Sequence, residues 1–295
     1  MKRETISAVD PYPRKRVAVS GTEFAYIDVG QGDPIVFLHG NPTFSYLWRN
    51  VIPHLERLGR CLAPDLIGMG QSGKAPHGSY RFLDHSRFLD AWFEALGLTQ
   101  NVTLVVHDWG SALGFYWACR HRAAVKGLAY MEAIVATLQW DEWPDNARNI
   151  FQLMRSPVGD ELILEKNIFI ERILPRAVLR ELSEAEMLAY RAPWKEPGES
   201  RRPMLSWPRE IPIDGQPADV AAIVSEYSQW LSQDATIPKL FVNAEPGSIL
   251  IGRQRDFCRK WPNQREVTVA GAHFVQEDSP HQVGEAIAEW YRGLR

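Results

Sequence analysis

The sequence predicts an α/β fold, with a mostly parallel central sheet flanked by helices and a helical segment inserted near the middle of the chain. Three observations carry this prediction. Short apolar runs bounded by turn residues recur in the first half of the chain and return near its end. Helical patterns lie between the later runs, and such alternation is typical of a parallel sheet covered on both faces. From residue 133 to residue 213 helical patterns continue without a strand-like run.

The expected elements follow the chain in a regular order. Strands are predicted at residues 16–19, 24–29, 35–38, 60–63, 102–106, 125–131, 239–243 and 265–269, and helices at 82–96, 111–120 and about 220–231. A last helix begins near Pro280, where Ser279 at the cap and Gln282 three residues on form a capping signature. We therefore expect residues 1–132 and 214–295 to form a core domain, and residues 133–213 to form a helical cap subdomain.

Composition excludes several classes of protein. The 295 residues are 45% apolar and 23% charged, as in a globular chain, and 33 Lys and Arg against 36 Asp and Glu give a net charge of −3. The chain therefore has no excess of positive charge that would attract nucleic acid or an anionic membrane. Three cysteines far apart exclude a disulfide framework and a thiolate zinc site. Because we find no signal peptide or membrane span, we expect a cytoplasmic protein with a small neutral ligand, a monomer or weak homo-oligomer.

A strand, a sharp turn and a helix follow one another around Asp108, in the segment LVVHDWGSALGF. In a G-x-S-x-G turn of this kind the central residue is forced outward at the end of the sheet, and its neighbours must be small. Asp also commonly caps helices, but the elements described below favour a nucleophile. A carboxylate with the ordinary pKa of about 3.9 attacks without first losing a proton. It suits displacement of a leaving group from saturated carbon, as in alkyl halides and epoxides.

Two further donors are expected beside this nucleophile. The predicted strand 35–38 runs into His39-Gly40-Asn41-Pro42, the loop that lends a backbone N–H to the oxyanion hole in α/β-hydrolases. The side chain of Asn41 and the indole N–H of Trp109 would stabilise a departing anion in a dry pocket. A lone Trp more often packs in a core, but the position beside Asp108 favours the functional role.

The general base is expected at His273, which lies between the last strand and the last helix. In an α/β-hydrolase the triad His comes last in the chain, after the nucleophile and the acid. Two acids are candidates because each follows a predicted strand, Glu132 and Glu245. Spacing alone does not choose between them.

Neither a cofactor nor a metal ion is expected. The segment Gly68 to Gly73 satisfies G-x-G-x-x-G after a strand, but Lys74-Ala75-Pro76 follows where a helix should begin. The glycines therefore do not predict a dinucleotide site.

The motifs together resemble the haloalkane dehalogenases, specifically the subfamily whose triad acid follows the sixth strand. The resemblance rests on HGNPTFSYLWRN, APDLIGMGQSGK, HDWGSALGF, MEAI, RPMLSWPREIPI and HFVQEDSP, and it runs from about residue 16 to the C-terminus. It implies that Asp108 is the nucleophile, His273 the base and Glu132 the acid, with Asn41 and Trp109 holding the halide. The acid is thereby chosen in favour of Glu132.

The resemblance also implies a reaction and a pocket. Members of this family hydrolyse halogenated alkanes to an alcohol, a halide ion and a proton through a covalent alkyl ester, so the expected partners are a small apolar halogenated substrate, water and halide. The implied pocket or tunnel residues are Phe151, Phe169, Trp207, Pro208, Ile211 and Ile249. Phe44 departs from the family, which usually carries a small hydroxyl residue there, and a ring so near Asn41 could narrow the pocket or shift a tunnel.

Three alternatives remain open. An epoxide hydrolase would also use an Asp nucleophile and a His base, but it needs cap tyrosines to protonate the epoxide oxygen. Tyr190 is the only Tyr between residues 133 and 213. Coelenterazine-type luciferases resemble the same subfamily and retain the same five residues. A non-catalytic binder on the same fold is disfavoured, because a fold alone would not preserve a complete triad.

Overall fold

The computed structural model describes residues 5–143 and 145–294. Its centre is an eight-stranded sheet in the order β1-β2-β4-β3-β5-β6-β7-β8. The β1–β2 and β2–β4 pairs are antiparallel and the other pairs are parallel. The strands are β1 Lys15–Val19, β2 Thr22–Val29, β3 Pro34–Leu38, β4 Arg60–Pro64, β5 Val102–Asp108, β6 Val125–Ala133, β7 Lys239–Pro246 and β8 Gln264–Gly271. The predicted α/β class is confirmed.

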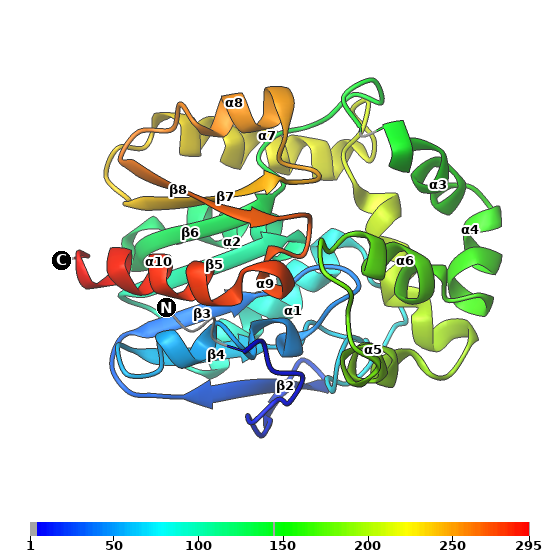
Figure 1. The fold of residues 1–295 in the computed structure, drawn as a ribbon, viewed down its shortest axis with the longest axis horizontal. Coiled ribbons are helices and arrows are strands. Elements are labelled where there is room, and N and C mark those ends of the chain that lie inside the picture. The colour runs from blue at the N-terminus through cyan, green and yellow to red at the C-terminus, as the bar shows by residue number, and fades with distance from the viewer. Residues whose placement is uncertain (1–4, 144, 295) are drawn as a thin grey trace.

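Helices cover both faces of this sheet, which explains why its middle strands are apolar on both sides. The core helices are α1 Phe82–Ala95, α2 Trp109–Arg120, α7 Ala218–Gln233, α8 Gly252–Cys258, α9 Val275–Asp278 and α10 Pro280–Arg292, with short 3₁₀ turns η1 Ser45–Trp48, η2 Ile52–His54 and η3 Arg122–Ala124. Helices α1 and α7 both pack against α2, which contacts β3, β5 and β6. Helix α10 contacts β7 and β8 and lies in front of the sheet, while α2 lies behind it (Figure 1).

The chain between β6 and α7 is helical. It forms α3 Asp145–Arg155, α4 Val158–Asp160, η4 Glu161–Glu165, η5 Phe169–Ile173, η6 Leu174–Arg176, α5 Glu184–Arg191, η7 Ala192–Trp194, η8 Gly198–Arg201 and α6 Arg202–Glu210. Figure 1 shows α3 to α6, coloured green to yellow, gathered beside one end of the sheet. The carboxyl ends of β3, β5 and β6 therefore have a helical layer close to them (Figure 1).

Two local predictions need correction. Helix α10 begins at Pro280 as predicted, but Ser279 does not cap it, because its hydroxyl donates to the Ala270 carbonyl at 2.6 Å. The helix expected from residue 111 starts at Trp109, directly after β5. No spacer separates strand from helix, so the turn at Asp108 is tighter than the sequence pattern indicated.

Other expectations concern the Gly68 segment and membranes. Residues 68–73 form turns, and no helix follows until α1 at Phe82. Within the described part of the chain, every helix is too short or too polar to cross a bilayer.

Candidate active site

Asp108 lies at the end of β5 in a strained backbone conformation. Its φ of +49° is in a region that side chains other than glycine rarely adopt, and such strain clusters at functional sites. Glycines allow this turn. A Cβ on Gly40 would lie 2.0 Å from Asp108 Oδ1, and one on Gly110 would lie 2.2 Å from the Leu38 carbonyl oxygen. The strain and the two close approaches direct the Asp108 side chain away from the sheet.

Backbone donors hold the Asp108 carboxylate. The N–H of Asn41 donates to Oδ1 at 2.7 Å, and the N–H of Trp109 also donates to the carboxylate. Burial raises the pKa of Asp108 above its ordinary value, while His273 and these two N–H groups oppose the rise. The donors therefore favour the ionised form that a nucleophile requires.

His273 follows β8 and lies between two carboxylates. Its Nε2 is 3.6 Å from Asp108 Oδ2, and its Nδ1 is 3.2 Å from Glu132 Oε2. Burial lowers the pKa of His273, but the hydrogen bond to Glu132 and the charges of Asp108 and Glu132 outweigh burial, so that the net pKa is raised. The three side chains form a continuous chain from carboxylate to imidazole to carboxylate.

The structure distinguishes the two candidate acids. Glu132, near the end of β6, is 1% exposed, and its Oε2 also accepts from the N–H groups of Ser248 and Ile249 at 3.0 and 2.9 Å. Glu245 is exposed and pairs with Arg255 at 3.3 Å. Only Glu132 reaches His273.

Asn41 and Trp109 present N–H groups beside Asp108. Asn41 Nδ2 donates to the Met204 carbonyl of α6 at 3.1 Å, which fixes the amide orientation and leaves its second N–H free. Within the described residues the indole N–H of Trp109 has no acceptor, although Trp109 lines the cavity. Two directional donors are thus available to an anion here.

A cavity of about 810 Å³ opens over these residues, a size suited to a small ligand. Asn41, Asp108, Trp109 and His273 line it. So do five of the six residues proposed for the pocket, namely Phe151, Phe169, Pro208, Ile211 and Ile249. Most of the remaining wall is aliphatic or aromatic, so an apolar ligand fits.

Trp207 and Phe44 lie away from that wall. Trp207 does not line the cavity; it stacks on Trp109 with ring centroids 4.7 Å apart and donates to Met69 Sδ at 3.4 Å. Phe44 packs against Tyr46 and Tyr190 and does not line the cavity either. Phe44 therefore does not narrow this cavity, because its ring packs between η1 and α5.

Comparisons with known proteins agree with this geometry. A family model described as alpha/beta hydrolase fold matches residues 33–280. A haloalkane dehalogenase of Sphingobium indicum is 59% identical over 285 residues, which is 96% of each chain. The chain belongs to the haloalkane dehalogenases.

A solved structure and a second relative are also similar to this dehalogenase. A crystal structure of a haloalkane dehalogenase from Bradyrhizobium elkani superposes with a TM-score of 0.90 at 43% identity, covering 95% of this chain and 97% of that one. The coelenterazine h 2-monooxygenase of Renilla reniformis is 45% identical over 86% of this chain and 81% of its own length. Proteins similar to this chain therefore include enzymes of more than one reaction.

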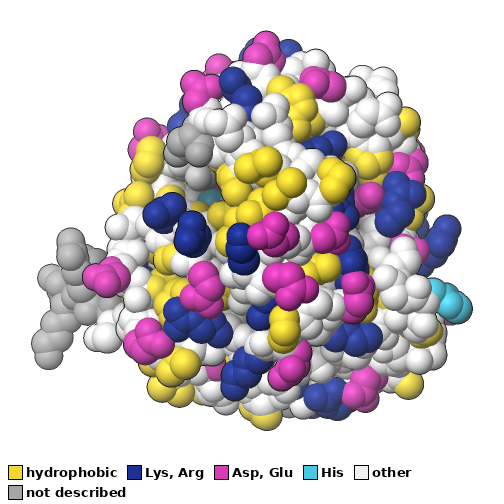
Figure 2. All heavy atoms as spheres, turned by 90° about the vertical axis from the view of Figure 1, so that its right-hand side faces the viewer, with side chains coloured by type: hydrophobic (Ala, Val, Ile, Leu, Met, Phe, Trp, Pro, Cys, Tyr) yellow, Lys and Arg dark blue, Asp and Glu magenta, His cyan; other side chains and the backbone are white. Residues whose placement is uncertain are grey.

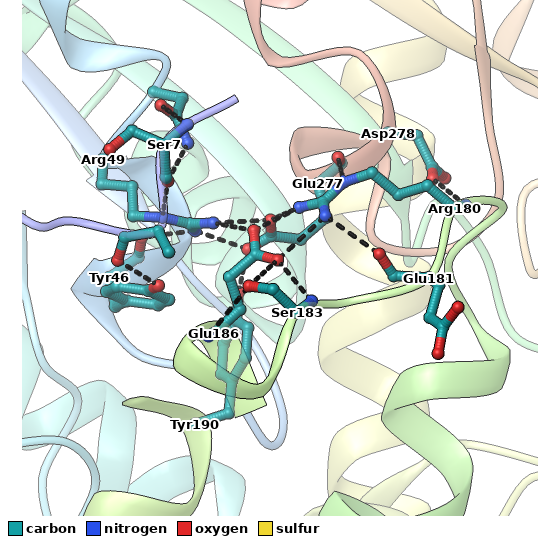
Figure 3. A network of polar contacts seen from close by, with 12 residues as sticks. Ser7, Tyr46, Arg49, Arg180, Glu181, Ser183, Glu186, Tyr190, Glu277 and Asp278 are labelled. Atoms are coloured by element: carbon teal, nitrogen blue, oxygen red, sulfur yellow. Dashed lines mark hydrogen bonds and ion pairs between the residues drawn. The ribbon is translucent and has the colours of Figure 1, made fainter. Parts of the chain in front are cut away.

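Sequence reasoning missed a polar network that supports the His273 loop of this dehalogenase (Figure 3). Glu277 of α9 accepts from Arg49 at 2.5 and 2.8 Å and from Arg180 at 2.7 Å. Glu186 of α5 accepts from Arg49 at 2.8 Å and from Arg180 at 2.5 Å. The only signal was the motif HFVQEDSP, in which Glu277 and Asp278 follow His273; nothing in the sequence names their distant partners.

His107 is another residue that the sequence patterns did not identify as functional. It is fully buried, its Nε2 contacts the His273 carbonyl at 2.8 Å, and burial holds its pKa well below the ordinary value. A neutral His107 thus donates to the backbone of the catalytic loop. Among the residues described, no group of three His, Cys, Asp or Glu side chains is arranged to hold a metal ion.

Proposed function

We propose that this haloalkane dehalogenase cleaves its substrates through a covalent ester on Asp108. It is a hydrolase of carbon–halide bonds by family. The observation that carries the mechanism is a carboxylate at the wall of an apolar cavity, held by two backbone N–H groups and 3.6 Å from an imidazole. The products are an alcohol, a halide ion and a proton.

In the first step Asp108 Oδ2 attacks the carbon that bears the halogen. Oδ1 already accepts the Asn41 N–H, so Oδ2 is the oxygen with the freer lone pairs. The carbon–oxygen bond forms as the carbon–halogen bond breaks, and the halide leaves with the bonding electrons. The free N–H of Asn41 and the indole N–H of Trp109 stabilise its charge, and such donors are strongest in a site that excludes water.

In the second step water attacks the carbonyl carbon of the ester. His273 Nε2 takes the proton from water, and Glu132 stabilises the imidazolium that results. Negative charge develops on the carbonyl oxygen, where the backbone N–H groups of Asn41 and Trp109 receive it. Collapse passes the hydroxyl proton of the intermediate to the leaving oxygen, releases the alcohol and restores the Asp108 carboxylate. His273 then gives its proton to solvent, and no cofactor or metal takes part.

The alternatives have less support. Epoxide opening needs an acid to protonate the epoxide oxygen, but among the described residues no Tyr lines the cavity, and the Tyr190 hydroxyl donates to Glu277 instead. The relative from Renilla reniformis makes light emission with coelenterazine a reasonable counter-test. The low cysteine content supports a cytoplasmic location.

Two variants test the mechanism. Asp108→Asn removes the nucleophile, and we expect halide release from 1-bromobutane to fall by on the order of 10⁴-fold or more. His273→Phe leaves attack possible but removes the base. We expect mass spectrometry of this variant to show one alkyl adduct, localised to Asp108.

Three results would contradict the proposal. They are halide release by Asp108→Asn at the wild-type rate, an adduct on another residue, and light emission with coelenterazine without halide release from any haloalkane. Diol formation from an epoxide faster than halide release would favour the epoxide hydrolase.

A further inference from the structure

The exposed charged side chains that line the cavity are basic. Apart from Asp108 and His273, the charged side chains that line the cavity are Lys166, Arg172 and Arg176, and all three residues are exposed. Figure 2 shows this face of the molecule, with hydrophobic side chains in a hollow and both basic and acidic side chains around its edge. The lining of the cavity is therefore apolar inside and basic at its exposed end.

The two arginines are free to bind an anion. Lys166 pairs with Glu161 at 2.6 Å, and Glu171, the acidic neighbour of Arg172, pairs with Arg191 at 2.9 Å. Within residues 5–143 and 145–294, the side chains of Arg172 and Arg176 make no hydrogen bond or ion pair. The chain as a whole carries a net charge of −3, so an excess of basic residues does not explain this positive rim.

An apolar cavity with a cationic rim matches a molecule with an apolar haloalkyl chain and an anionic end. The halogenated end would reach Asp108, while the anionic end stays at the surface and keeps most of its hydration. It therefore avoids the desolvation cost of a buried ion pair. Exposed ion pairs are individually weak, but two cations also raise the rate of encounter with an anion, and salt screens both effects.

We propose that the guanidinium groups of Arg172 and Arg176 form a subsite for the anionic end of a haloalkane, which makes ω-halogenated carboxylates preferred substrates over neutral analogues of the same length. This inference rests on the proposed function, because the carboxylate substrate is cleaved at Asp108 by the same two steps. Its products are an ω-hydroxycarboxylate, a halide ion and a proton.

The test compares two substrates of equal length. The value of kcat/KM is measured by bromide release from 6-bromohexanoate and from the neutral 6-bromohexanamide, at low ionic strength and in added sodium sulfate. We expect the acid to exceed the amide by about three- to tenfold at low salt, and the ratio to approach one when the Debye length falls to a few ångströms. A series from 4-bromobutanoate to 10-bromodecanoate finds the chain length that spans the cavity.

Variants assign the effect to the rim. Arg172→Gln/Arg176→Gln should bring the ratio close to one, because it lowers kcat/KM for the acid more than kcat/KM for the amide. Arg57→Gln/Lys195→Gln is the matched control. It removes two exposed cations that neither pair with other described residues nor line the cavity, so the ratio should stay at the wild-type value.

The outcomes separate the two proposals. Two results overturn the anion subsite: a wild-type acid-to-amide ratio of one at low salt, or a ratio that Arg172→Gln/Arg176→Gln leaves unchanged. In either case bromide release from the amide would still support the proposed function. An equal loss of the ratio in the control variant shows an effect of net charge alone and also overturns the subsite. Absence of bromide release from both substrates and from 1-bromobutane counts against the proposed function itself.

Discussion

The electrostatics of His273 change during the proposed reaction. In the free protein the charges of Asp108 and Glu132 help to raise its pKa, against the effect of burial. Esterification removes the Asp108 charge from a position 3.6 Å from Nε2. We therefore expect the pKa of His273 to be lower in the alkyl-enzyme than in the free protein.

This expectation has a direction that kinetics can measure. Ester hydrolysis needs neutral imidazole, so its rate falls as pH falls through the pKa of His273 in the intermediate. Rapid-quench single turnovers with 1-bromobutane give that midpoint, and NMR titration of His273 gives the pKa of the free protein, which should lie above the ordinary 6.5. Equal midpoints in the two states would show that Asp108 does not influence His273.

The choice of triad acid gives a second prediction at this scale. Glu132→Gln keeps the shape of the side chain but removes the charge that stabilises the imidazolium. We expect hydrolysis of the ester to slow by about 10²- to 10⁴-fold while alkylation of Asp108 continues. Glu245→Gln, the same change at the other candidate, should leave both steps within about twofold. The reverse pattern, measured by quenched-flow mass spectrometry, would assign the acid to Glu245.

Single residues were predictable from sequence where a motif fixes the local backbone. The elbow at Asp108 and the loop at Asn41 are local patterns, and the structure brings their residues into contact. Glu132 and Glu245 were not separable from the residues alone, because both follow strands and the choice depends on which side chain faces the loop after β8. The side-chain directions of Trp207 and Phe44 depend on packing between distant elements, which spacing does not record.

At the scale of elements, a segment after η6 holds both sides of the His273 loop. The Phe274 N–H donates to the Ala177 carbonyl at 3.1 Å, and the Arg180 Nε donates to the Glu277 carbonyl at 2.5 Å. Asp278 accepts from the N–H of Leu179 at 2.7 Å and from that of Ala272 at 2.9 Å. Residues 177–180 therefore form hydrogen bonds with the loop on both sides of the catalytic base.

Arg180 is expected to act as a positioning residue for His273. Arg180→Gln removes the ion pairs to Glu186 and Glu277, and we expect ester hydrolysis to slow by about three- to tenfold, since small misplacements of a base are costly. Alkylation does not use His273 as a base and should continue at the wild-type rate. Arg180→Lys keeps the charge and should recover part of the hydrolysis rate.

Single-turnover measurements distinguish positioning from damage to the fold. A structural defect lowers the fraction of molecules that become alkylated, whereas a displaced base lowers the hydrolysis rate per alkylated molecule. If Arg180→Gln changed only the alkylated fraction, the positioning role would be wrong.

The same scale shows what an element's sequence pattern can and cannot predict. The positions of the strands and main helices followed from apolar periodicity, because burial on one or both faces imposes that periodicity. The prediction that Ser279 caps α10 was wrong because the Ser279 hydroxyl donates instead to the Ala270 carbonyl at the end of β8. Local signatures predict helix ends only where no tertiary partner competes.

Across the whole molecule, one buried network joins segments that are far apart in sequence. Arg49 follows η1, Glu186 lies in α5 and Glu277 lies in α9, and Arg49 also donates to the Ser7 carbonyl at 2.7 Å near the start of the described chain (Figure 3). Arg49, Glu186 and Glu277 are each at most 2% exposed. No sequence pattern predicts such pairings, because each partner is an ordinary charged residue until the fold buries it.

Glu186 should make the stability of the molecule depend on pH. Burial favours its neutral form, but hydrogen bonds from Arg180 and Ser183 outweigh burial and lower the pKa of Glu186 to about 2, from an ordinary 4.5. Because the folded state holds the carboxylate at the lower pKa, this stabilisation is present above about pH 4.5 and is lost as pH falls toward 2. Its magnitude is at most about 3 to 4 kcal/mol, from roughly 1.4 kcal/mol per pKa unit.

Glu186→Gln tests this coupling by urea unfolding at several pH values. At pH 7 we expect the variant to be less stable by about 3 kcal/mol, because two buried or half-buried arginines lose a counter-charge. The difference from wild type should shrink between pH 4.5 and pH 2, where wild-type Glu186 also becomes neutral. Glu184→Gln, in the same helix but 74% exposed, should differ from wild type by under about 0.5 kcal/mol throughout. A Glu186 difference that stays constant with pH would show that shape and hydrogen bonding, and not the carboxylate charge, stabilise this junction.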